Sequence, residues 1–245
     1  MVDFEQAGFN LKRLDRLKTS ISADIDSSPI GIGFETLDRF MFDPEPCYPR
    51  LAELGVKWAR CQTGWSRCET TKGEYAFEWL DDVVDNLLRI GIRPWFCVSF
   101  GNQLYMPDAP HVSAVGRVPI YYGEAVVEAW RNYCRALAER FKGRVDHWEV
   151  WNEPNHGGGF WAPEKPNGAD YAKLVEITAE AIKKVLPKAV IIAGASGAGE
   201  TYGFLKDALD AGMGRHIDKW AVHPYRAVPE QNYALEIKSL RALLK

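Results

Sequence analysis

The chain has 245 residues, 47% of them apolar and 26% charged, which is enough material for one large domain or two small ones around a sizeable core. Its formal net charge is -3, and without a basic surplus neither nucleic acid nor an anionic membrane is expected as a partner. Five cysteines at scattered spacing argue against a disulfide framework or a zinc site, and they favour a reducing, cytoplasmic location.

The first predicted element is a short amphipathic helix near the N-terminus. Leucines recur at helical spacing from Leu11, and Ile21 continues the pattern among charged residues. This segment lacks the apolar core of a signal peptide, and no run elsewhere reaches the length of a membrane span. A Ser-Ser-Pro break follows at residues 27–29. We therefore predict a lead-in helix within residues 1–28 and a main domain over residues 29–245.

Strand-like and helical patterns then alternate along the main domain. Strands are predicted, in chain order, over residues 30–37, 56–62, 94–100, 145–151, 190–195 and 217–223. Amphipathic helices are predicted over residues 45–55, 80–88, 126–141, 171–185, 204–209 and 234–244. Alternation of this kind implies a parallel sheet with right-handed crossovers, and the chain holds about six such βα units.

A doubly wound open sheet and a barrel both fit this pattern. The open sheet often binds nucleotides, but Gly194, Gly197 and Gly199 do not form GxGxxG, and no P-loop lysine follows them. Long polar and aromatic segments come after the strands, which suits either architecture. The choice between them depends on the motif at the end of the fourth strand.

That motif is Trp-Glu-Val-Trp-Asn-Glu-Pro-Asn, over residues 148–155. Pro154 cannot extend the hydrogen-bond ladder, so the strand ends there and presents Glu153 at the rim, which in a barrel faces the active site. Aromatic residues around it would partly desolvate this carboxyl, as a general acid requires. Asn152 offers both a donor and an acceptor for a sugar hydroxyl.

The motif resembles the acid/base segment of the retaining clan-A glycoside hydrolases, and most closely that of family 39, the β-xylosidase and α-L-iduronidase group. Trp58-Ala59-Arg60 ends the second strand, where this clan has an arginine, and His223-Pro224-Tyr225 ends the sixth, where it has a histidine and a tyrosine. The resemblance implies an α/β fold, an incomplete (β/α)8 TIM barrel with about six βα units in this chain.

The resemblance also implies the chemistry. Glu153 would be the general acid/base of a retaining mechanism on a β-xyloside or a related oligosaccharide, and the nucleophile would lie on a seventh strand beyond Lys245. Neither a cofactor nor a metal is predicted, because the histidines show no metal spacing with carboxylates. The predicted substrate-binding residues are Asn152, Arg60, His223, Tyr225, Trp65, Trp161 and Glu35.

Several of these residues also have simpler interpretations. Glu35 ends the first strand and suits either a sugar ligand or a buried ion pair. Glu149 lies on the same alternating face as Glu153, and we predict that it is the interior partner of a basic group such as Arg60. Trp65 follows the second strand and, with Trp161, is predicted to offer its ring to a sugar.

Two alternatives to an active enzyme remain open at this point. A non-catalytic carbohydrate-binding or scaffold barrel would keep the sugar contacts and perform no chemistry. Alternatively, a further copy or a different chain would complete the site, since unpaired sheet edges beside the first and sixth strands invite association.

Overall fold

The computed structural model describes residues 18–157, 159–197, 201–228 and 231–244. Most of the predicted lead-in helix lies outside these residues. The described part begins with a short 3₁₀ turn, η1, at Ser22–Asp24, which packs against the start of the main domain through a hydrogen bond from Ser22 Oγ to the Leu51 carbonyl.

Six strands form one parallel sheet in the order in which they occur along the chain. They are β1 Gly31–Gly33, β2 Trp58–Gln62, β3 Arg93–Val98, β4 His147–Val150, β5 Val190–Ser196 and β6 Lys219–Val222. The strands are all parallel and each pairs with the next along the chain, so they form an incomplete (β/α)8 barrel, as the sequence predicted.

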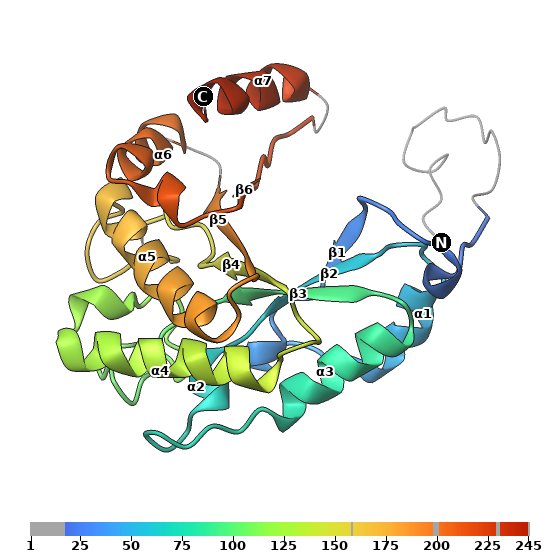
Figure 1. Ribbon diagram of the computed structural model, residues 1–245, viewed down its shortest axis with the longest axis horizontal. Coiled ribbons are helices and arrows are strands. Elements are labelled where there is room, and N and C mark those ends of the chain that lie inside the picture. The colour runs from blue at the N-terminus through green and yellow to red at the C-terminus, as the bar shows by residue number, and fades with distance from the viewer. Residues whose placement is uncertain (1–17, 158, 198–200, 229–230, 245) are drawn as a thin grey trace, which may run out of the picture.

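Helices follow the strands and cover the outer, convex face of the curved sheet (Figure 1). They are α1 Tyr48–Ala52, α2 Trp65–Cys68, α3 Glu78–Arg89, α4 Glu124–Arg140, α5 Gly168–Val185, α6 Thr201–Asp210 and α7 Tyr233–Leu243. Short 3₁₀ turns lie between them: η2 Leu37–Arg39, η3 Glu45–Cys47, η4 Pro119–Tyr121 and η5 Met213–Arg215.

The core lies between the sheet and its helices. Side chains on the outer face of the strands, such as Phe96, Trp148 and Ile191, are fully buried against apolar helix residues. Helix α5 begins where the Asn167 side chain accepts the N–H groups of the first turn, at 2.8 and 3.1 Å. Trp130 of α4 donates to the Thr178 hydroxyl of α5 at 2.9 Å and joins the two longest helices.

The first strand is shorter than the sequence predicts. Regular pairing ends at Gly33, and the backbone at Thr36 and Phe40 is left-handed, so the chain turns over the carboxyl ends of the strands. This turn carries Glu35 and Arg39 to the mouth of the barrel, where both line the cavity described below.

Candidate active site

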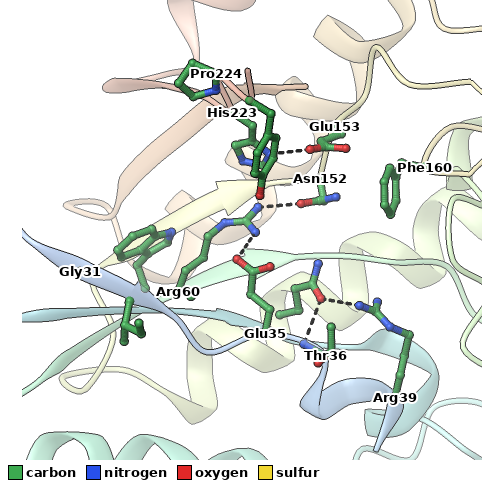
Figure 2. Close-up of a pocket in the computed structure, with 15 residues that line it drawn as sticks. Gly31, Glu35, Thr36, Arg39, Arg60, Asn152, Glu153, Phe160, His223 and Pro224 are labelled. Carbon is green, nitrogen blue, oxygen red and sulfur yellow. Dashed lines mark hydrogen bonds and ion pairs between the residues drawn. The ribbon is translucent and has the colours of Figure 1, made fainter. Parts of the chain in front are cut away.

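A cavity of about 650 Å³ opens at the carboxyl ends of the strands, where the active sites of barrel enzymes lie. Figure 2 shows Arg60, Glu35 and Asn152 directed toward one another, with Glu153 and His223 beside them. The residues that line this cavity are Gly31, Ile32, Gly33, Glu35, Thr36, Arg39, Arg60, Gln62, Trp95, Asn152, Glu153, Phe160, His223, Pro224 and Tyr225.

Arg60 of β2 is the centre of a buried hydrogen-bond network. Its Nε donates to Glu149 Oε2 at 2.7 Å, and its Nη1 donates to Glu35 Oε1 at 2.6 Å. Its Nη2 donates to Glu149 Oε1 at 3.0 Å and to Asn152 Oδ1 at 3.1 Å. The Arg60 side chain is 8% exposed and that of Glu149 is 2% exposed, so the bonds between these two side chains are shielded from water. One guanidinium therefore fixes the orientation of both Glu35 and Asn152.

Charge balance explains why this network can be buried. Burial alone would lower the pKa of Arg60, but the charges of Glu149 and Glu35 and the hydrogen bonds to Glu149 outweigh it and raise that pKa well above its ordinary value. Burial raises the pKa of the Cys97 thiol to about 12, so near neutral pH it is an uncharged group that accepts from Arg60 at 3.2 Å. The negative charge beside Arg60 therefore comes from the carboxylates of Glu149 and Glu35.

The chain leaves β4 through an unusual backbone path. Trp151 and Glu153 have backbone φ values of +66° and +48°, which residues other than glycine seldom adopt. The Trp151 ring is fully buried, and its Nε1 donates to the Phe160 carbonyl at 2.6 Å, which holds the first of these turns. Pro154 prevents the strand from continuing. These constraints place the Glu153 side chain at the edge of the cavity.

A bulge in β5 supports Glu153 from the adjacent strand. The pairing of β5 with β6 shifts there, and Gly194 has φ of +100°. The Tyr171 hydroxyl accepts the Gly194 N–H at 3.0 Å and donates to the Val150 carbonyl at 2.9 Å, which ties the bulge to β4. The Ala195 carbonyl then accepts the Glu153 N–H at 2.9 Å. The backbone of Glu153 is therefore held by a neighbouring strand as well as by its own.

His223 contacts the carboxylate of Glu153 from the end of β6. Its Nδ1 lies 2.9 Å from Glu153 Oε1, and the two side chains are 17% and 14% exposed. Its Nε2 lies 3.9 Å from Glu149 Oε1. The imidazole thus stands between two carboxyl groups, and its Nδ1 contact fixes the direction of the Glu153 side chain.

Comparison with known proteins adds to this geometry. The family model for glycosyl hydrolases family 39 matches residues 53–213, which include β2 to α6 and the whole Trp148–Asn155 motif. The chain belongs to glycosyl hydrolases family 39.

Relatives of this family 39 chain include a beta-xylosidase from Geobacillus stearothermophilus, 36% identical over 126 residues, with 46% of this chain and 23% of that protein covered. A solved family 39 glycoside hydrolase from Bacteroides cellulosilyticus WH2 is 28% identical, with a TM-score of 0.57 over 74% of this chain and 35% of that one. A family 39 beta-xylosidase from Caulobacter crescentus, 21% identical, matches with a TM-score of 0.66 over 94% of this chain and 52% of that one, which supports the fold alone. The matched segments span only 22% to 29% of the length of the first three curated relatives.

Most of the predicted site residues of this family 39 chain lie together. Those that line the cavity are Glu35, Arg60, Asn152, Glu153, His223 and Tyr225. The prediction that Glu149 is the interior partner of Arg60 is confirmed by their two hydrogen bonds. The Tyr225 side chain is largely exposed, at 78%, and lies at the outer rim.

The prediction that Trp65 and Trp161 offer their rings to a sugar is wrong. Trp65 is fully buried, donates to Glu69 at 2.5 Å and stacks on Tyr105 with ring centroids 5.0 Å apart. Trp161 is 1% exposed and donates to the Tyr121 hydroxyl at 3.1 Å. Each ring follows a strand, as predicted, but turns inward to close the core and leaves no face for a sugar.

Sequence reasoning missed Trp95 and Gln62, which do line the cavity. The Trp95 Nε1 donates to Glu149 Oε2 at 3.0 Å, and Gln62 Oε1 accepts from Arg39 at 2.9 Å. The sequence did indicate Gln62 as a site residue, because it lies two residues after Arg60 and therefore on the same face of β2.

Among the described residues, no group of three or more histidine, cysteine, aspartate or glutamate side chains could hold a metal ion. No helix in the described ranges is long and apolar enough to cross a membrane.

Proposed function

We propose that this chain carries the acid/base half of a retaining β-glycosidase active site, with Glu153 as the general acid and base. The observation that carries the proposal is the position of Glu153, whose backbone is fixed by β4 and β5 and whose carboxylate is directed by His223 at 2.9 Å. It lies at the edge of a cavity of about 650 Å³ that is large enough for a sugar ring.

In such a mechanism, the Glu153 carboxyl donates its proton to the glycosidic oxygen while a second carboxylate attacks the anomeric carbon. The C–O bond breaks, the leaving group departs as an alcohol, and a covalent glycosyl-enzyme forms. Glu153, now a carboxylate, then takes a proton from the water that attacks this intermediate, and the sugar is released with its configuration retained.

The second carboxylate is proposed to come from a strand that follows β6 in the barrel. Glu35 and Glu149 are poor candidates, because each is bound to Arg60, at 2.6 and 2.7 Å. A carboxylate that neutralises a buried guanidinium is a weak nucleophile, and its loss would leave that charge unpaired. We assign Glu35, which lines the cavity, to sugar binding and Glu149 to the support of Arg60.

The charges around the cavity favour a neutral sugar as the substrate, such as a β-xyloside. Of the described residues that line it, Arg60 is bound by Glu149 and Glu35, and Arg39 by Asp38 at 3.3 Å. A phosphorylated sugar would need a cation that carboxylates do not already occupy. The names of the beta-xylosidase relatives support the same choice of substrate.

The proposal is tested in the full protein by changing Glu153 to alanine and measuring kcat/KM on aryl β-xylosides. We expect a loss of about 10²- to 10⁴-fold on poor leaving groups, which need the proton, and a much smaller loss on good leaving groups. Glu164→Ala, an exposed carboxylate in the same loop, is the matched control and should leave both rates unchanged. Equal losses on both kinds of leaving group would contradict the role of Glu153, and sugar binding without any turnover in the unmodified protein would favour a non-catalytic barrel.

A further inference from the structure

A side chain takes the place of one ladder hydrogen bond between β4 and β5. The pairing of these strands is regular as far as Glu149 opposite Ile192. In a parallel ladder of this register, the Gly194 N–H would next donate to the Val150 carbonyl. The Tyr171 hydroxyl lies between these two groups instead, accepting from the first at 3.0 Å and donating to the second at 2.9 Å. A hydroxyl is therefore inserted into the sheet at this point.

The path of β5 changes where the hydroxyl is inserted. Gly194 has φ of +100° and Ala195 has φ of +40°, so two successive residues leave the extended conformation. A Cβ at Gly194 would lie 2.5 Å from the Ala221 carbonyl oxygen, which only glycine avoids. The pairing of β5 with β6 shifts between Ala193 and Ser196. The strand therefore bulges directly after the position of the inserted hydroxyl.

The bulge is in direct contact with the backbone of Glu153. The Ala195 carbonyl, one residue after the insertion, accepts the Glu153 N–H at 2.9 Å. Glu153 lies beyond the end of β4 and has φ of +48°, so the regular ladder of that strand does not hold it. The position of the Ala195 carbonyl therefore determines where the backbone of Glu153 lies.

The Tyr171 side chain is held firmly enough to act as a spacer. It projects from the first turns of α5 and is fully buried. Its ring stacks on Phe204 with centroids 5.7 Å apart and meets Trp161 edge to face at 6.1 Å. Burial raises the pKa of the Tyr171 hydroxyl well above its ordinary value, so the hydroxyl keeps the proton that it donates to Val150.

We propose that Tyr171 is a positioning residue for the acid/base, and that its hydroxyl, as the spacer between β4 and β5, sets the place of the Glu153 carboxyl. The proposal rests on the proposed function of Glu153. Tyr171 does not line the cavity, so it acts through Ala195 and Glu153 and not by touching the substrate. Without the hydroxyl, the two strands close to a direct bond or leave two buried backbone groups unpaired, and either change moves the Ala195 carbonyl.

The first test is Tyr171→Phe in the full protein, which removes the hydroxyl and keeps the ring. We expect kcat/KM on aryl β-xylosides with poor leaving groups to fall about tenfold, because proton transfer depends on the placement of the acid. On good leaving groups, which do not need the proton, the change should stay within about twofold. Tyr133→Phe is the matched control, because Tyr133 is also fully buried and donates one hydrogen bond, to the Thr63 hydroxyl at 2.9 Å. It should leave the ratio of the two rates unchanged.

Ala195→Gly is a second variant that tests the same path without removing a buried hydroxyl. Glycine adopts a φ of +40° readily, so this variant should fold, but its carbonyl is held less firmly. We expect the rate on poor leaving groups to fall about threefold relative to that on good ones. Neither change should lower the ratio further in the Glu153→Ala background, because the acid that the bulge positions is then absent.

The outcomes separate this proposal from the one on which it depends. An unchanged ratio in Tyr171→Phe, or in Ala195→Gly if the first variant does not fold, overturns the positioning role. An equal fall in Tyr133→Phe, or a further fall in the Glu153→Ala background, overturns it as well. Equal losses on both kinds of leaving group in Glu153→Ala alone contradict the proposed function instead. A ratio that falls in both bulge variants only while Glu153 is present supports the assignment.

Discussion

The two sides of the active site are built in different ways. On the β1–β4 side, Arg60 joins two carboxylates and an amide at 2.6 to 3.1 Å, and its side chain is 8% exposed. On the β5–β6 side, Tyr225 is 78% exposed, and Leu240 is the one buried residue of α7. The difference indicates a rigid side of the site around Arg60 and a more open side at the ends of β5 and β6.

The largest effect should come from removing the centre of the rigid side. Arg60→Ala leaves Glu149 buried without a counter-charge, and we expect the free energy of unfolding to fall by about 3–5 kcal/mol in urea denaturation. Arg93→Ala is the matched control one strand away, because the side chains of its ion pair with Asp146 are 52% and 54% exposed. That variant should lose no more than about 1 kcal/mol. Similar losses in both variants would contradict a special role for the buried network.

A smaller effect is expected on the open side, and it should appear in activity. Gly197→Ala places a Cβ 3.0 Å from Glu153 Cδ and from His156 Cδ2, so the acid must shift by a few tenths of an ångström. We expect kcat/KM on poor leaving groups to fall by about tenfold, because proton transfer depends on exact placement of the acid. Gly203→Ala in α6 is the control, since its new Cβ would meet no atom within 4 Å. Full activity in Gly197→Ala would show that Glu153 is not held by this contact.

The β/α order and the position of Glu153 at the end of β4 could be predicted from the sequence, because local sequence patterns determine both. Alternation of strand and helix sets the parallel sheet, and Pro154 marks the end of β4 beside Glu153. The Arg60–Glu149 pair followed from the alternating face of β4, since a carboxylate directed into a barrel needs a partner.

The orientation of the aromatic rings could not be predicted in the same way. Trp65 and Trp161 follow strands, as sugar platforms do, but whether such a ring turns toward the core or the cavity depends on helices distant in sequence. Trp65, for example, is held by Tyr133 of α4, with ring centroids 5.7 Å apart. The left-handed turns at Trp151 and Glu153 also lack a local signal, because neither residue is a glycine.

The central claim is that Glu153 delivers a proton on the face of the sugar from which the leaving group departs. The most direct measurement is the product that Glu153→Ala forms in the full protein from an activated aryl β-xyloside in the presence of azide, analysed by NMR. Removal of the carboxylate opens that face to azide, which should react with the glycosyl-enzyme to give the β-xylosyl azide. An α-xylosyl azide, or turnover that azide does not change, would contradict the assignment of Glu153 as the acid/base of a retaining enzyme.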